Sequence, residues 1–147
     1  MKSLWQREAR QEILARFERL TPDSQPRWGK MNATGMAWHM ARNYDMAFGE
    51  ITVPSKMLPI RFFPLKQLIV YVLPFPKGAP TAPELVHRGQ GEFVNALHDC
   101  VKSVERFGTE QPTRAWPDHP VFGKIGAKGW GVLGYKHADH HLRQFGV

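Results

Sequence analysis

Two histidines near the end of the chain stand at a spacing that suits metal binding. His137 and His141 lie four residues apart in the segment 127–145. Residues four apart sit one above the other on a helix, with Cβ atoms about 5–6 Å apart, so the two imidazoles aim at one point. Imidazole is a common ligand of divalent transition metals. The spacing therefore predicts a pair of metal ligands, although H-x-x-x-H on its own also occurs by chance on helix surfaces.

Two neighbours of this pair are candidates for the rim of such a site. His140 lies three residues after His137 and is an alternative to His141 as a ligand. Its direction on a helix is rotated by about 100° from that of His141, so we expect it at the rim or on the surface. Tyr135 is the second rim candidate. Either side chain could serve there as an acid or a base.

His39 supplies a third candidate ligand. It lies between two methionines on the apolar face of the segment 32–50. A lone histidine in that position is more often a core residue than a ligand. Three inward histidines on two helices make that interpretation harder to sustain, because bundles build metal sites between facing helices. The sequence predicts a site of His39, His137 and His141, with Asn43 one turn beyond His39 and placed to orient a ligand or substrate.

Three neutral imidazoles restrict the metal and its chemistry. They suit divalent transition metals and leave positions open for water or substrate. We expect zinc or nickel, with iron or manganese as alternatives. A metal with an open position lowers the pKa of a bound water or thiol, which makes a nucleophile at neutral pH. The single cysteine, Cys100, lies within an expected helix, where a thiol is usually a core residue.

Four amphipathic segments must position these residues. Apolar side chains recur in them at three- and four-residue spacing, with arginine and glutamate on the other faces. Helices are predicted over about 3–20, 32–50, 89–107 and 127–145. Ser3 and Asn32 are expected to cap the first two helices, and Gly108 to end the third.

The connection 51–86 is long and unusually apolar. Residues 58–76 are rich in large hydrophobic side chains, but prolines and two basic residues, Arg61 and Lys66, interrupt them. A membrane helix needs roughly 20 uninterrupted apolar residues. We therefore expect a crossover with one short helix at about 64–73, and no membrane span. A surface that touches a membrane or forms a homodimer is the alternative.

These elements predict the fold class. A chain of 147 residues, 42% of them hydrophobic, suffices for one domain covering 1–147. Four long helices with a long connection between the second and third favour an all-α four-helix bundle, because a long crossover lets consecutive helices run parallel.

Composition narrows the partners and the compartment. The net charge is +7, but lysines and arginines are scattered singly and never form a run of three. Nucleic-acid binders usually concentrate such charge, so we favour a solvated basic surface, which also draws in anionic small molecules, over nucleic-acid binding. One cysteine fits a reducing compartment, and the charged N-terminus shows no signal sequence. We expect a cytoplasmic protein.

Four pieces of the chain carry a family resemblance. The first contains Trp28-Gly29 and leads to His39, and the last contains the pair His137 and His141. The pieces span 28–33, 76–85, 119–124 and 135–146. In this order they resemble the DinB/YfiT-like metalloenzymes, within a branch of unknown function. One departure lies at the last ligand, where DinB-type sequences often read H-R-G-Q and this chain reads His141-Leu142-Arg143-Gln144.

The resemblance implies a fold, a site and a chemistry. The fold is a four-helix bundle with up-down-down-up topology and a long crossover between helices 2 and 3. The site is a metal triad of one histidine from the second helix and an H-x-x-x-H pair from the fourth, here His39, His137 and His141. Related families include bacillithiol-using S-transferases and a mycothiol-dependent maleylpyruvate isomerase. In these enzymes the metal is thought to bind and activate a thiolate.

Two classes of function follow. The first is a metal-dependent transferase or hydrolase that acts on a small anionic or thiol substrate, with or without a low-molecular-weight thiol. The second is a non-catalytic bundle that binds a metal or ligand, or keeps a vestigial site. The second class stays open because no carboxylate stands at helical spacing to the triad: Asp45 points elsewhere and Glu50 lies three turns from His39.

Overall fold

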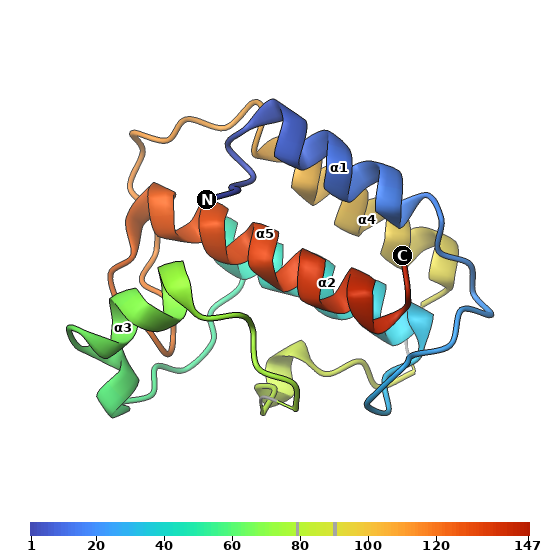
Figure 1. Ribbon diagram of the computed structural model, residues 1–147, viewed down its shortest axis with the longest axis horizontal. Coiled ribbons are helices and arrows are strands. Elements are labelled where there is room, and N and C mark those ends of the chain that lie inside the picture. Colours follow the sequence, from blue (N-terminus) through green and yellow to red (C-terminus); the bar gives the residue numbers. More distant parts are fainter. Residues whose placement is uncertain (79, 90) are drawn as a thin grey trace.

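The computed structural model describes residues 1–78, 80–89 and 91–147. In these ranges the chain forms five α-helices and no β-strand, which confirms the predicted all-α class (Figure 1). The helices are α1 Arg7–Phe17, α2 Ala33–Phe48, α3 Leu65–Gln67, α4 Phe93–Arg106 and α5 Gly126–Gln144.

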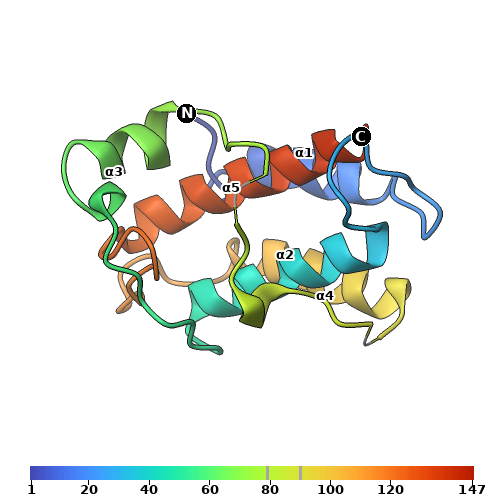
Figure 2. The ribbon, with the colours of Figure 1, turned by 90° about the horizontal axis from the view of Figure 1, so that it is seen from below.

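The four long helices form a bundle. α2 packs most extensively against α4, α1 contacts both α5 and α4, and α5 contacts α2. In Figure 1 the chain runs from left to right along α1 and α5 and in the opposite direction along α2 and α4. Figure 2 separates α2 from α5, which overlap in the first view. The fully buried side chains at the centre include Phe17, Met36, Met40, Val104 and Leu142.

The start of the chain differs from the prediction. α1 begins at Arg7, and its N-cap residue is Gln6, which makes no side-chain cap. Ser3 therefore does not cap the helix. The reason is a tertiary contact: the Leu4 N–H donates to the Gly131 carbonyl at 3.0 Å, and the Trp5 indole donates to the Ala127 carbonyl at 2.7 Å. Residues 3–5 are held against α5 in place of extending α1.

α2 begins and ends as its sequence indicates. The Asn32 side chain accepts the Gly35 N–H at 2.7 Å, which confirms the predicted N-cap. The helix ends at Gly49, whose φ of +80° is the left-handed conformation that favours glycine. Both ends of the helix that carries His39 are therefore fixed by local interactions.

α4 packs on the core through one face. Its buried residues are Ala96, Cys100 and Val104, and the partly buried Phe93, Leu97 and Val101 pack against the same core. Cys100 is fully buried, as the sequence predicts for a core thiol, and burial raises its pKa.

The crossover between α2 and α4 carries a small lobe. We call residues 57–75 the crossover lobe. In it a 3₁₀ turn, Pro59–Arg61, precedes α3, and α3 continues into a π-helical turn, Leu68–Val72. This confirms the predicted short helix. The lobe packs on α5 through Val70, which is fully buried. No helix in the described ranges is long and apolar enough to cross a membrane.

Candidate metal centre

Three histidines meet between α2 and α5. His39 comes from α2, and His137 and His141 come from α5. The Nε2 atom of His137 lies 3.2 Å from Nε2 of His39 and 3.0 Å from Nε2 of His141. Two nitrogen ligands of a tetrahedral zinc ion stand about 3.3 Å apart, given bonds of about 2.0–2.1 Å. These two distances are close to that spacing, and ligand atoms of all three histidines lie within 4.8 Å of one another.

The outer nitrogen of His39 is held by a backbone carbonyl. Nδ1 lies 2.9 Å from the carbonyl oxygen of Leu85. A carbonyl accepts only, so Nδ1 carries the proton and donates it. The lone pair of His39 is then on Nε2, which faces the other two rings. This is the arrangement by which proteins orient a metal-binding imidazole.

Gln144 holds His141 in the same way. Its Nε2 amide donates to the Trp28 carbonyl at 2.6 Å, which directs its Oε1 toward His141. The Oε1 atom lies 2.8 Å from Nδ1 of His141 and accepts a hydrogen bond from its N–H group. The lone pair of His141 is consequently also on Nε2. The contact between Gln144 and His141 is buried, with Gln144 only 5% exposed and His141 8% exposed.

The donor set suits a cation. The Nε2 atoms of His39 and His141 both present lone pairs to Nε2 of His137. The His137 ring has at most one proton there, which can satisfy one of these two neighbours, and the Asn43 amide nitrogen, 3.2 Å from Nε2 of His39, can donate to the other. A divalent ion would accept the lone pairs of all three rings at once, so the residues present fit a bound metal.

Burial keeps these rings neutral. It lowers the pKa of His39, and it lowers the pKa of His141 to about 3. Burial also holds the pKa of His137 well below its usual value, reinforced by the adjacent His141 and His39 rings. Neutral imidazole is the form that ligates metals. The cluster is thus ready to ligate at neutral pH.

Asn43 and Phe75 contact the cluster from two sides. The Asn43 amide donates to the His39 carbonyl at 2.8 Å and lies 3.2 Å from Nε2 of His39. The structure therefore places it against the ring that it was expected to orient. Phe75 stacks on His137 with ring centroids 4.6 Å apart and planes inclined by 6°. It covers one face of that ring.

His140 lies beside the cluster. Its ring is half-buried, with its centroid 5.1 Å from that of His141, 5.2 Å from Phe75 and 5.8 Å from Trp28. The nitrogens that converge belong to His141 and not to His140. Lys77 extends this edge, with its Nζ 4.2 Å from the centre of the Trp28 ring.

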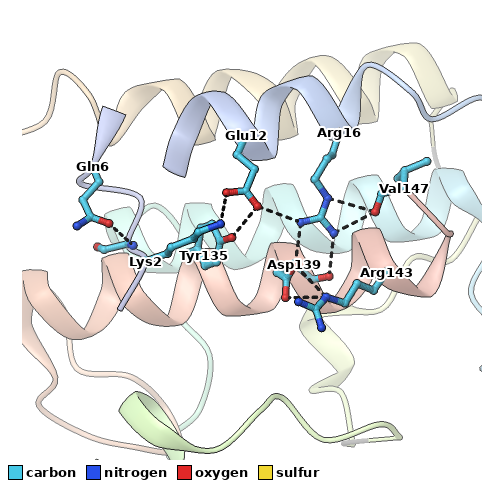
Figure 3. Close-up of polar contacts among 9 residues, drawn as sticks. Lys2, Gln6, Glu12, Arg16, Tyr135, Asp139, Arg143 and Val147 are labelled. Atoms are coloured by element: carbon cyan, nitrogen blue, oxygen red, sulfur yellow. Dashed lines mark hydrogen bonds and ion pairs between the residues drawn. The ribbon is translucent and has the colours of Figure 1, made fainter. Parts of the chain in front are cut away.

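Tyr135 lies away from the cluster. Its hydroxyl donates to Oε1 of Glu12 at 2.9 Å, on the side of α5 that faces α1 (Figure 3). Its side chain is buried in that contact. The structure brings together His39, His137 and His141 with Asn43, and it leaves Tyr135 outside.

The sequence did not lead us to predict three groups that contact the histidines. Gln144 carried a signal, since it stands three residues after His141 on the same helix and so reaches the same face. The Leu85 carbonyl and Phe75 carried none, because each comes from a distant stretch of irregular chain. Only the tertiary fold brings these two groups to the histidines.

Comparison of the chain with protein-family models, with curated proteins and with solved structures found no match. What the molecule presents is an all-helical domain with a buried group of three histidines that can hold a metal ion. Its function must be argued from that group.

Proposed function

We propose that the protein is a metal-dependent enzyme of the DinB/YfiT-like kind, with His39, His137 and His141 as the ligands of a divalent transition metal. The observation that carries the proposal is the convergence of three Nε2 atoms, two of them oriented by hydrogen bonds at Nδ1. Two buried acceptors aimed in this way are typical of a metal centre.

An all-nitrogen donor set favours zinc or nickel, with iron or manganese as alternatives. Such an ion would lower the pKa of a bound water or thiol at a position that the three histidines leave open. The chain's own part is to orient His39 and His141 through Leu85 and Gln144, and to shield His137 from water with Phe75.

The arrangement of the helices supports the family resemblance. The long connection between α2 and α4 joins two helices that run the same way in Figure 1, as an up-down-down-up bundle requires. The ligands come from the second and fourth long helices, in the pattern of one histidine plus an H-x-x-x-H pair.

We propose a transferase or hydrolase acting on a small anionic or thiol compound. The basic net charge of +7 attracts anions, and Lys77 stands at the edge formed by Trp28 and His140. A low-molecular-weight thiol as second substrate rests on the resemblance alone. His140 is the proposed acid or base at this edge, because its ring borders His141.

One observation favours a second candidate, a metal- or ligand-binding bundle without catalysis. Among the described residues, the other side chains that hydrogen-bond to the three ligands or contact their rings are amides and aromatic rings: Asn43, Gln144, Phe75 and His140. None is a carboxylate. A site without a carboxylate has fewer groups able to transfer protons.

Turnover assays separate the two candidates. Metal-loaded wild type, His137→Ala and His98→Ala would be tested on a panel of thiol conjugates and carboxylic esters. His98 is an exposed histidine of α4 and serves as the matched control. The enzyme proposal expects turnover by wild type and His98→Ala, lost by at least about a hundredfold in His137→Ala. Metal binding with no turnover of any substrate would favour the binding protein.

A further inference from the structure

The helix of the crossover lobe is apolar on two sides but buried on one. Val70 is fully buried against Phe122 and Leu133. Leu65, Leu68 and Val72 stand at positions i, i+3 and i+7, and they are exposed. A helix that is apolar all round normally has a second partner for its outer face.

The loops that flank this helix carry further exposed apolar side chains. Eight of the eleven exposed large hydrophobic side chains of the described residues belong to the crossover lobe, so they are concentrated in one segment. The eight are Met57, Leu58, Phe62, Phe63, Leu65, Leu68, Val72 and Leu73. Phe63 is 80% exposed and Val72 is 69% exposed. Figures 1 and 2 show the lobe beside the first half of α5, on the far side from α4. Concentrations of this kind mark interaction surfaces.

The charge of the segment is of one sign. From Ile51 to Pro83 the sequence contains four lysines and arginines and no aspartate or glutamate: Lys56, Arg61, Lys66 and Lys77. Arg61 donates to the Pro120 carbonyl at 2.9 Å, and Lys66 donates to the Lys124 carbonyl at 3.2 Å. These partners are neutral, and within the described ranges neither side chain forms an ion pair, so both positive charges lie beside the apolar side chains without an acidic partner there.

We propose that the crossover lobe binds the surface of an anionic membrane. Exposed phenylalanine and leucine enter the boundary between headgroups and acyl chains, and neighbouring lysines and arginines pair with anionic headgroups. A second copy of the chain fits less well, because a two-fold contact between lobes would place Lys56, Arg61 and Lys66 near the same cations of the other copy. The mode is interfacial, since no helix of the described residues is both long and apolar enough to span a bilayer.

Vesicle flotation tests this proposal. The intact protein would be mixed with vesicles of phosphatidylglycerol and phosphatidylcholine, or of phosphatidylcholine alone. We expect binding to the anionic vesicles, weakened by added salt because the headgroup attraction is screened. Phe63→Ser combined with Val72→Ser should weaken binding by at least about tenfold, because both exposed apolar groups are lost. Val94→Ser is the matched control, since Val94 is 71% exposed on α4, outside the lobe.

Three results would overturn the proposal. The proposal is wrong if the wild-type protein does not bind the anionic vesicles. It is also wrong if Val94→Ser loses as much binding as the double variant of Phe63 and Val72. A dimer in sedimentation that the lobe substitutions dissociate, with no vesicle binding, would assign the surface to a second copy. Circular dichroism of each variant reports folding. The proposal is independent of the histidine cluster, so a protein that binds vesicles but no metal would still support it.

Discussion

At the scale of single residues, the cluster depends on what holds each outer nitrogen. Leu85 and Gln144 fix Nδ1 of His39 and His141, and this places both lone pairs on Nε2. Gln144 in turn is held by the Trp28 carbonyl. The two hydrogen bonds that link Trp28, Gln144 and His141 therefore set the direction of one proposed ligand without a metal. Such outer contacts raise metal affinity by keeping the ring in place.

Gln144→Leu should weaken metal binding by about 10–100-fold, because His141 loses the acceptor that orients it. Competition with a chromophoric chelator measures this change. Gln11→Leu is the control, since Gln11 is exposed on α1. Equal affinity in wild type and Gln144→Leu would show that the hydrogen bond does not orient the ligand.

At the scale of elements, the polar contacts between α1 and α5, which we call the seam, orient α5 so that His137 faces α2. Tyr135 and Asp139 stand two residues either side of His137, so they point to the opposite side of α5. Glu12 accepts a hydrogen bond from the Tyr135 hydroxyl, and Arg16 forms an ion pair with Asp139 at 2.7 Å (Figure 3). These contacts fix the rotation of α5 about its axis.

Arg16→Met should lower the free energy of unfolding by about 1–3 kcal/mol, because a half-buried, charge-assisted hydrogen bond to Asp139 is lost. Arg143→Met removes another pair with Asp139, but Arg143 is 70% exposed, so its loss should cost about 0.5 kcal/mol or less. Urea unfolding of the two variants compares them. Equal losses would mean that the seam is no stronger than a surface ion pair.

Local spacing predicted much of this architecture, and tertiary contacts account for what it missed. The α2 cap at Asn32 and the pairing of His137 with His141 follow from residues a few positions apart. The prediction that Ser3 caps α1 was wrong, because hydrogen bonds hold Leu4 and Trp5 against α5. The acceptor at Leu85 lies 46 residues from His39 in sequence. No helical period can predict a contact of that range.

At the scale of the whole molecule, burial sets how the fold responds to acid. It is the main cause that lowers the pKa of five histidines: His39, His119, His137, His140 and His141. The unfolded chain takes up protons near its ordinary histidine pKa of about 6.5, whereas the folded chain does so only at lower pH. Stability is therefore greatest above that pH and falls as the solution is acidified.

His119→Asn should reduce this acid sensitivity. Burial, together with Arg61, lowers the pKa of His119 to about 3, and its Nδ1 accepts the Val121 and Phe122 N–H groups at 3.1 and 3.2 Å. Asparagine keeps an acceptor but takes up no proton. The free energy of unfolding should then fall less steeply from pH 6 to pH 4, by up to about 1.4 kcal/mol per pH unit. Identical slopes in urea titrations would contradict the assignment.

The central claim is that His39, His137 and His141 hold a metal ion, and metal content per chain tests it most directly. Elemental analysis would compare wild type, His137→Ala and His98→Ala, all purified without a histidine tag. We predict about one transition-metal ion per chain in wild type and His98→Ala, and a loss of most of it in His137→Ala. Wild type that holds no metal, even after incubation with excess divalent ions and removal of the unbound fraction, would contradict the account.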